Sequence, residues 1–145
     1  MGVEPTGIGR VAARLAKHVE RALAEVGLSL PQYRVLANLA EGPSAASALA
    51  ELLIVSRPSV TALADGLVER GLIERRPEPG DRRSVIHVLT PAGRELVTGA
   101  DAAIDGRLAG LLRGLAEPER RRAVAGLRVW HKALEAARTT AVKAG

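Results

Sequence analysis

Apolar residues recur at helical spacing along most of the chain. In the N-terminal segment one stripe predicts a helix that Gly27 ends. Its members are Ile8, Val11, Leu15, Val19, Leu23 and Val26. The predicted helices cover residues 8–26, 32–40, 45–53, 56–70, 91–113 and 117–137, and the tail, residues 138–145, is expected to fray. Ser44 and Ser56 are expected to cap the third and fourth of these helices.

The pattern changes between the fourth and the fifth predicted helix. Residues 72–76 and 84–89 are short segments, and the second is rich in β-branched residues, so both are expected to be strands. The polar segment 77–83 between them contains Pro79 and Gly80, which favour a turn. Three helices packed ahead of a β-hairpin are the plan of a winged helix–turn–helix. The sequence therefore predicts a mainly α fold with a small β-hairpin wing.

The first and last helices carry apolar stripes that a small central domain cannot cover alone. The stripe of the last helix consists of Val124, Leu127, Trp130, Leu134 and Ala137. Two copies of the chain that pack these stripes together would bury them, which predicts a homodimer. The expected organisation is a single domain over residues 1–145. It would hold a winged-helix lobe at 30–90 and a helical dimerisation lobe made of 7–27 with 91–138.

Composition narrows the class of protein. A chain of 145 residues fits one domain, and an aromatic content of 1% requires an aliphatic core. The formal net charge of +5 favours a polyanionic partner such as nucleic acid. With no cysteine, disulfides, thiol catalysis and cysteine-ligated metals are excluded. No signal-like run and no segment of roughly 18 apolar residues occurs. The protein is therefore expected in the cytoplasm, with no membrane partner.

The helix predicted at 56–70 is the candidate for reading DNA, because one α-helix fits the major groove. Its inward face is expected to hold Val60, Leu63, Leu67 and Val68. The opposite flank holds Ser59, Thr61, Ala62 and Asp65, most of them small enough to let the backbone approach DNA. Arg57 is long enough to reach a phosphate or a guanine edge. The alternative is an ordinary amphipathic helix on which Ser56 is only a cap.

The predicted hairpin tip carries a sharper signal. Arg82 and Arg83 follow Pro79 and Gly80 on an exposed arm, and arginine suits a narrow, electronegative minor groove. Asp81 is expected to orient one guanidinium through a bidentate ion pair. The alternative is a solvated turn whose salt bridge contributes about 0–1 kcal/mol.

From Gln32 onward the chain resembles the MarR family of bacterial transcriptional regulators. The resemblance is carried by QYRVL at 32–36, LAELL at 49–53, VSRPSVT at 55–61, LVERGLIER at 67–75, DRRS at 81–84 and VLTPAG at 88–93. It covers about residues 7–137. The stretch 49–93 is highly specific, because the order and the spacing of its motifs agree together.

The resemblance implies roles for the candidate residues. Pro58, Ser59 and Thr61 match the major-groove helix, beside Arg57. Arg82 and Arg83 match the wing-tip positions of the family that enter the minor groove, and Asp81 matches the acidic residue that braces them. Phosphate contacts are implied for Ser44 and Ser47, and the helix N-terminus at Ser56 also favours phosphate. Ala62 departs from relatives with a longer polar reader, so specificity is expected to depend on Arg57 and on groove shape.

The family also implies release from DNA by a small aromatic or phenolic effector. Its pocket would lie between the dimerisation helices and the DNA-binding lobe. Candidate lining residues are Arg14, His18, Tyr33, Arg34 and Trp130. Plain core packing is the alternative for Tyr33 and Trp130, because aromatic side chains mostly contribute buried area. His18 is most simply a flanking surface residue.

The expected function is sequence-specific binding of duplex DNA by a homodimer that regulates transcription. By the family's habit it would be a repressor on a pseudo-palindromic operator. The alternative is a winged-helix scaffold for protein interactions without DNA binding. An enzyme is the poorest hypothesis, because no histidine cluster or carboxylate pair forms a recognisable motif. No cofactor or metal is expected. The charged run at 119–122 is expected to be a solvated helix face.

Overall fold

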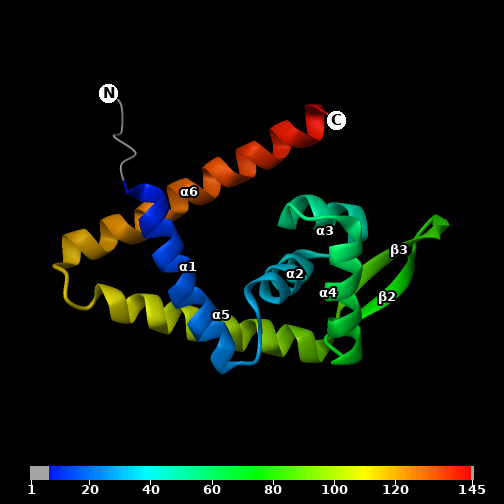
Figure 1. Ribbon diagram of the computed structural model, residues 1–145, viewed down its shortest axis with the longest axis horizontal. Helices are drawn as coiled ribbons and strands as arrows, with labels where there is room; N and C mark the ends of the chain where they lie inside the picture. Colours follow the sequence, from blue (N-terminus) through cyan, green and yellow to red (C-terminus); the bar gives the residue numbers. More distant parts are fainter. Residues whose placement is uncertain (1–6, 145) are drawn as a thin grey trace. The chain divides into compact units, whose positions relative to one another are not determined.

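In residues 7–144, which the computed structural model describes, the chain forms six helices and a three-stranded sheet (Figure 1). The helices are α1 (Ile8–Glu25), α2 (Leu30–Glu41), α3 (Ala46–Leu53), α4 (Arg57–Glu69), α5 (Pro91–Leu112) and α6 (Glu117–Ala144). The strands are β1 (Ser44–Ala45), β2 (Ile73–Glu78) and β3 (Asp81–Leu89). The predicted mainly α fold with a hairpin wing is confirmed.

The chain divides into two compact units, one running up to Leu108 and the other beginning at Ala109. The first unit has an aliphatic core, as the composition predicts. Its largest fully buried side chains are Leu23, Leu36, Leu39, Leu49, Leu67, Ile73, Val35 and Val60. Val97 and Ile104 of α5 belong to the same core. The proposed division into lobes at 30–90 and at 7–27 with 91–138 stays a prediction.

A capping box starts α2 two residues earlier than the sequence suggested. The Ser29 hydroxyl accepts from the Gln32 backbone N–H at 3.2 Å, and the Gln32 side chain accepts from the Ser29 N–H at 2.9 Å. This reciprocal pair satisfies two of the free N–H groups of the helix terminus. The serine followed three residues later by glutamine was the signal in the sequence.

The sheet has the strand order β1-β3-β2, and its edge strand β1 was not predicted. Ser44 pairs with His87, and Ala45 pairs with Ile86. The expectation that Ser44 caps α3 is therefore wrong: Ala45 stands at the N-cap without a side-chain bond, and the Ser44 backbone is held by the sheet. The Ser44 hydroxyl instead accepts from Asn38 Nδ2 at 2.9 Å.

The wing is longer than predicted. Strands β2 and β3 pair from Ile73–Leu89 to Glu78–Asp81, with an irregularity between Pro77 and Glu78. Only Pro79 and Gly80 remain as the turn, and Gly80 takes a positive φ of 85° that favours glycine. The arginines at 82 and 83 thus belong to the start of β3 rather than to a loop.

The start of α5 is locked to the base of the wing. Thr90 Oγ1 donates to the Gly71 carbonyl at 2.7 Å and accepts from the Gly93 N–H at 3.0 Å. A Cβ on Gly93 would lie 2.1 Å from the Leu72 carbonyl oxygen. The close approach of the two backbones therefore requires glycine at this position.

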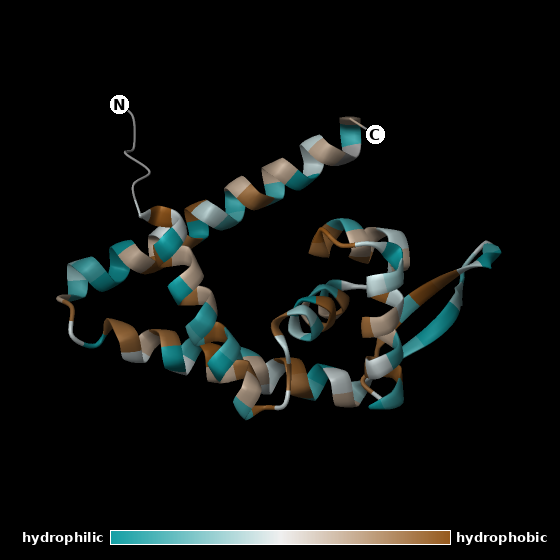
Figure 2. Cartoon of the chain, in the orientation of Figure 1, coloured by the Kyte–Doolittle hydropathy of each residue, from teal (hydrophilic) through white to brown (hydrophobic). Residues whose placement is uncertain are grey.

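In the second unit, α6 continues past the expected end at 137 and reaches Ala144; Gly145 lies outside the described residues. Its last turns are supported by an ion pair between Arg138 and Glu135 at 3.3 Å. Polar and apolar segments alternate along this helix (Figure 2). Its apolar stripe is open to solvent, because Val124, Leu127, Trp130 and Leu134 are 44–62% exposed. Core packing of Trp130 is thus not observed within its unit.

Across the described part of the chain, no single helix is long and apolar enough to cross a bilayer. Helices α3 and α4 reach the length and hydrophobicity of a membrane span only when they are taken together, and they are bent by 107° relative to one another.

Candidate nucleic-acid interface

Helices α3 and α4 form a helix–turn–helix with a bend of 107°. Within the turn, Ile54 takes a left-handed conformation with φ 56° and is 89% exposed. Ser56 then caps α4, as predicted: its hydroxyl accepts from the Ser59 N–H at 3.3 Å and lies 3.0 Å from the Ser59 hydroxyl. The cap fixes the N-terminus of α4 at the surface of the unit.

Helix α4 buries one face and exposes the other, as predicted. Val60, Ala64 and Leu67 are buried, while Leu63 and Val68 are partly buried. The exposed side begins at the N-terminus and contains Arg57, Pro58, Ser59, Thr61 and Ala62. The first turn holds no acidic residue, so the partial positive charge of the helix N-terminus is not neutralised locally. This end of α4 therefore favours an anion such as phosphate.

The wing tip presents two arginines without a neutralising partner. Arg82 and Arg83 are exposed, and neither forms an ion pair with any described residue. The predicted ion pair with Asp81 is wrong. The Asp81 carboxylate instead accepts from the Arg83 backbone N–H at 3.0 Å and from the Ser84 hydroxyl at 2.9 Å. Asp81 thus braces the backbone of the tip and leaves both guanidinium groups free.

An ion pair that the sequence did not reveal joins the wing to α4. Arg75 Nη2 of β2 lies 2.5 Å from Asp65 Oδ1 of α4. The two residues are 10 positions apart in the sequence, and the packing of β2 against α4 brings them together. The pair links the two elements that present the candidate DNA contacts.

His87 is buried in the sheet between the two edge strands. Its Nδ1 lies 3.3 Å from the Ser44 carbonyl oxygen, and Arg75 is its partner in β2. Burial lowers the pKa of His87, and the positive charge of Arg75 adds to this effect, although the hydrogen bond to Ser44 opposes it. Burial thus favours the neutral form of the imidazole at the base of the wing.

The residues proposed for phosphate contacts differ in accessibility. Ser56 is exposed, whereas Ser44 and Ser47 are half-buried in β1 and the first turn of α3. The Ser44 hydroxyl is also engaged with Asn38. Phosphate contacts by these serines stay predictions.

The candidate effector residues do not form one site in the described units. Tyr33 donates to Asp101 of α5 at 2.5 Å, and burial together with this carboxylate raises its pKa above the usual range. His18 accepts from Arg107 Nε at 3.1 Å, so it is not a free surface residue. Arg14 is exposed on α1, and Trp130 belongs to the other unit.

A different hollow lies beside the helix–turn–helix. This cleft of about 320 Å³ is lined by Leu30, Pro31, Arg34, Leu53, Val55, Ser59 and Leu63. Arg34 holds the end of α3 in place by donating to the Leu52 carbonyl at 2.6 Å. Ser59 belongs at the same time to the exposed start of α4. The cleft therefore combines one cation with apolar walls directly behind the candidate DNA-reading helix.

A capped, exposed helix N-terminus beside an arginine-tipped hairpin defines a winged helix–turn–helix DNA-binding protein. Residues 26–84 match the model of the MarR family. Over 113 residues the chain is 32% identical to the HTH-type transcriptional repressor Rv2887 of Mycobacterium tuberculosis, covering 77% of this chain and 81% of that protein. The chain therefore belongs to the MarR family of transcriptional regulators.

Solved structures agree with this assignment. The crystal structure of Rv1404 from Mycobacterium tuberculosis matches with a TM-score of 0.79 and 28% identity, covering 90% of this chain and 91% of that one. The complex of Rv2887 with salicylic acid matches with a TM-score of 0.71 and 27% identity, covering 90% of this chain and 97% of that one. The relatives of this chain are named as transcriptional regulators, not as enzymes.

Proposed function

We propose that the chain represses transcription by binding an operator in duplex DNA as a homodimer. The observation that carries the proposal is the joint exposure of the α4 N-terminus and of two unpaired wing arginines on one unit. Each protomer would place Arg57, Pro58, Ser59 and Thr61 in a major groove. Its Arg82 and Arg83 would enter the flanking minor groove, where a narrow groove attracts guanidinium groups.

The homodimer would form through the apolar stripes of the terminal helices. Ile8 and Val11 of α1 are 39% and 62% exposed, and the stripe of α6 is similarly open. Burying these side chains would stabilise the dimer by roughly 25 cal/mol per Å² of apolar surface. A two-fold dimer implies a pseudo-palindromic operator with half-sites about one helical turn apart. Such a regulator would act in the cytoplasm, where bacterial DNA lies.

Fluorescence anisotropy with duplexes from the region upstream of the gene tests the DNA-binding proposal. Wild-type protein is expected to bind one fragment saturably, and Arg82→Ala/Arg83→Ala is expected to lose that binding. Arg10→Ala/Arg21→Ala removes the same charge from exposed positions of α1 and serves as the matched control. Equal losses of affinity in both variants would show that the wing arginines act only through the net charge of the protein. Absence of operator preference in an unbiased genomic selection would favour the scaffold alternative.

The effector, in this proposal, is a small aromatic acid bound in the cleft of Arg34. Rv2887 has been crystallised with salicylic acid and with p-aminosalicylic acid. A carboxylate would pair with the Arg34 guanidinium, and the ring would contact the apolar walls. Since Ser59 lines the cleft, an occupant would disturb the start of α4. Salicylate is expected to release DNA from the wild type but not from Leu63→Phe, which fills the cleft and retains Arg34; equal release from both proteins would exclude this cleft.

A further inference from the structure

The net charge of the chain is divided unevenly between its two units. Residues 109–145 hold eight of the 21 Lys and Arg residues and three of the 16 Asp and Glu residues, so the whole net charge of +5 lies there. The thirteen basic and thirteen acidic residues before Ala109 cancel. The unit that carries the winged helix thus has no net attraction for a polyanion at long range. The attraction that the composition predicts belongs to the C-terminal unit.

Four cations of α6 share one side of the helix. Arg128, Lys132 and Lys143 follow Arg121 by 7, 11 and 22 positions, and these spacings return to nearly the same direction at 3.6 residues per turn. The row is about 33 Å long at 1.5 Å per residue. All four side chains are exposed, and among the described residues only Arg121 has an ion-pair partner, Glu117. These four residues are named here the basic face of α6. Glu135 stands on the same side, seven positions after Arg128, and is paired with Arg138 at 3.3 Å.

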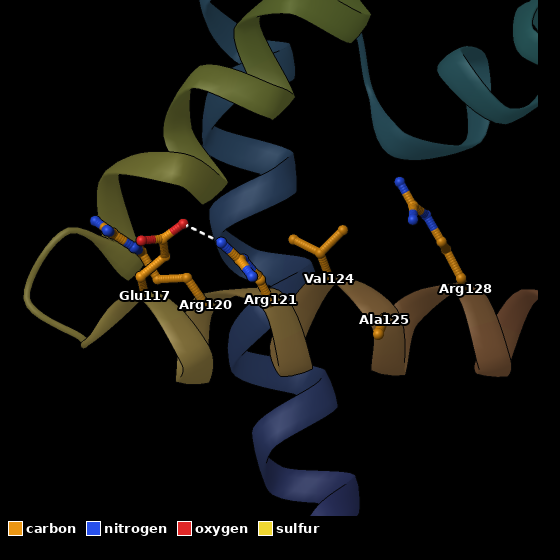
Figure 3. A pocket seen from close by; sticks show the side chains of 6 residues that line it. All are labelled: Glu117, Arg120, Arg121, Val124, Ala125 and Arg128. Carbon is orange, nitrogen blue, oxygen red and sulfur yellow. Dashed lines mark hydrogen bonds and ion pairs between the residues drawn. The ribbon is translucent and has the colours of Figure 1, made fainter.

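The N-terminal end of this face, at residues 117–128, is an open groove of about 630 Å³. In Figure 3, Arg121 and Arg128 project from the same side of the helix, with Val124 between them. The groove is lined by three arginines and two small aliphatic residues, and Glu117 is the one carboxylate among its lining residues. Guanidinium groups suit phosphate, because their donors match its oxygens in pairs.

Most of the apolar stripe lies on the side of α6 opposite to the basic face, and Val124 of the stripe lies at the boundary, between Arg121 and Arg128 (Figure 3). Leu134 follows Lys132, and Trp130 follows Arg128, by two positions, which is a rotation of about 200° around the helix. A second copy of the chain seated on Leu127, Trp130 and Leu134 therefore covers the side of α6 opposite to the basic face, with Val124 at the edge of the contact. A bilayer would need the same apolar side chains that the second copy covers, which favours a nucleic acid over a membrane as the partner.

We propose that the basic face of α6 is a second surface that binds the phosphate backbone of duplex DNA without sequence preference. It belongs to the C-terminal unit, whereas α4 and the wing, which we propose to read the operator, belong to the first unit. This inference rests on the proposed function in one respect, the occupation of the apolar stripe by a partner copy. The surface supplies the long-range attraction that the neutral winged-helix unit lacks, and it holds the protein on DNA outside the operator.

Binding to a long random-sequence duplex, measured by anisotropy as a function of salt, tests the inference. The variant Arg121→Gln/Arg128→Gln/Lys132→Gln removes three cations and keeps residues that favour a helix. For each basic face that contacts the duplex, the slope of log K against log salt is expected to become shallower by about 3, because each lost phosphate contact removes about 0.9. From about 50 to 200 mM salt, wild-type affinity should fall roughly 40-fold further than that of the variant.

The matched control is Arg10→Gln/Lys17→Gln/Arg21→Gln, which removes three exposed cations of α1 and keeps the basic face. An equal loss of slope in this control would overturn the inference, because net charge rather than the face would then set the affinity. An unchanged slope in the α6 variant would also overturn it. So would an α6 variant that loses binding to anionic phospholipid vesicles but keeps its binding to DNA. Circular dichroism and sedimentation are used to check that both variants remain folded dimers.

The operator duplex separates this inference from the proposed function. The α6 variant is expected to retain its preference for the operator over random DNA, and Arg82→Ala/Arg83→Ala to lose that preference while keeping most of the random-duplex slope. A wild-type protein with no operator preference would refute the proposed function and leave the slope test of α6 intact.

Discussion

Replacing Ile54 with glycine is expected to stabilise the protein, in contrast to most substitutions. Ile54 holds φ at 56° in the turn before α4, where its Cβ crowds the following carbonyl. For an L-residue this conformation costs about 1–2 kcal/mol. Because the side chain is 89% exposed, its removal sacrifices almost no apolar burial. Glycine regains the conformational strain but adds about 0.4–1 kcal/mol of unfolded-state entropy.

The net gain for Ile54→Gly is therefore about 0.5–1 kcal/mol, or about 2–4 °C in melting temperature for a chain of this size. Thermal unfolding followed by circular dichroism measures it, at fixed protein concentration because dimer stability depends on concentration. Ile54→Ala is the matched control: it also removes the exposed apolar chain but retains the Cβ, so it should gain nothing comparable. A glycine variant no more stable than the alanine variant would refute the reasoning from strain.

Three further outcomes follow from contacts of the wing. Gly93→Ala should lower the free energy of unfolding by about 3 kcal/mol and the melting temperature by about 10 °C, because the added Cβ would lie 2.1 Å from the Leu72 carbonyl oxygen. Calorimetry measures the melting temperature, and an unchanged value would show that α5 shifts freely. Because the pKa of His87 is lowered in the folded protein, its contribution to the free energy of unfolding is complete above the unfolded pKa of about 6.5 and is lost as the pH falls through the lower folded pKa. The melting temperature of His87→Gln should therefore fall less steeply in acid than that of the wild type. Parallel curves of melting temperature against pH would count against burial of His87 as the cause. Asp81→Ala should weaken operator affinity roughly three- to tenfold, because it loses hydrogen bonds worth about 0.5–1.5 kcal/mol, whereas Asp81→Asn keeps an acceptor and most of the affinity; equal losses would point to charge instead.

Local signals in the sequence were sufficient for the helix that presents the DNA contacts. Ser56 followed by proline in the first helical turn marks a helix start, and the apolar spacing of Val60 and Leu67 identifies the buried face. These features depend on neighbours within one or two turns. The same holds for the turn at Pro79 and Gly80, although the strands extend closer to it than their β-branched content suggested.

Features that depend on distant partners were not predictable in this way. A two-residue strand at Ser44 has no periodicity to detect and exists only because β3 offers an edge for pairing. The ion pair of Asp65 with Arg75 requires the packing of β2 against α4, and the engagement of Asp81 with backbone depends on the exact geometry of the tip. The uneven distribution of charge was present in the sequence, but it acquires meaning only once the boundary after Leu108 is known.

A neutral winged-helix unit restricts how operator binding can respond to salt. With no net charge before Ala109, the attraction must come from contacts at short range, and the exposed cations at the interface that form no ion pair with a described residue are Arg57, Arg82 and Arg83. If each of these neutralised one phosphate, a homodimer would make six such contacts, and log K would fall with log salt at a slope of about −5. Titration of the operator complex between about 50 and 200 mM salt measures this slope. A slope near −5 that Arg121→Gln/Arg128→Gln/Lys132→Gln leaves unchanged would assign operator binding to the winged helix alone. A steeper slope that the same variant reduces to about −5 would instead show that α6 contacts the operator DNA as well, because no other part of the chain carries the required excess of cations.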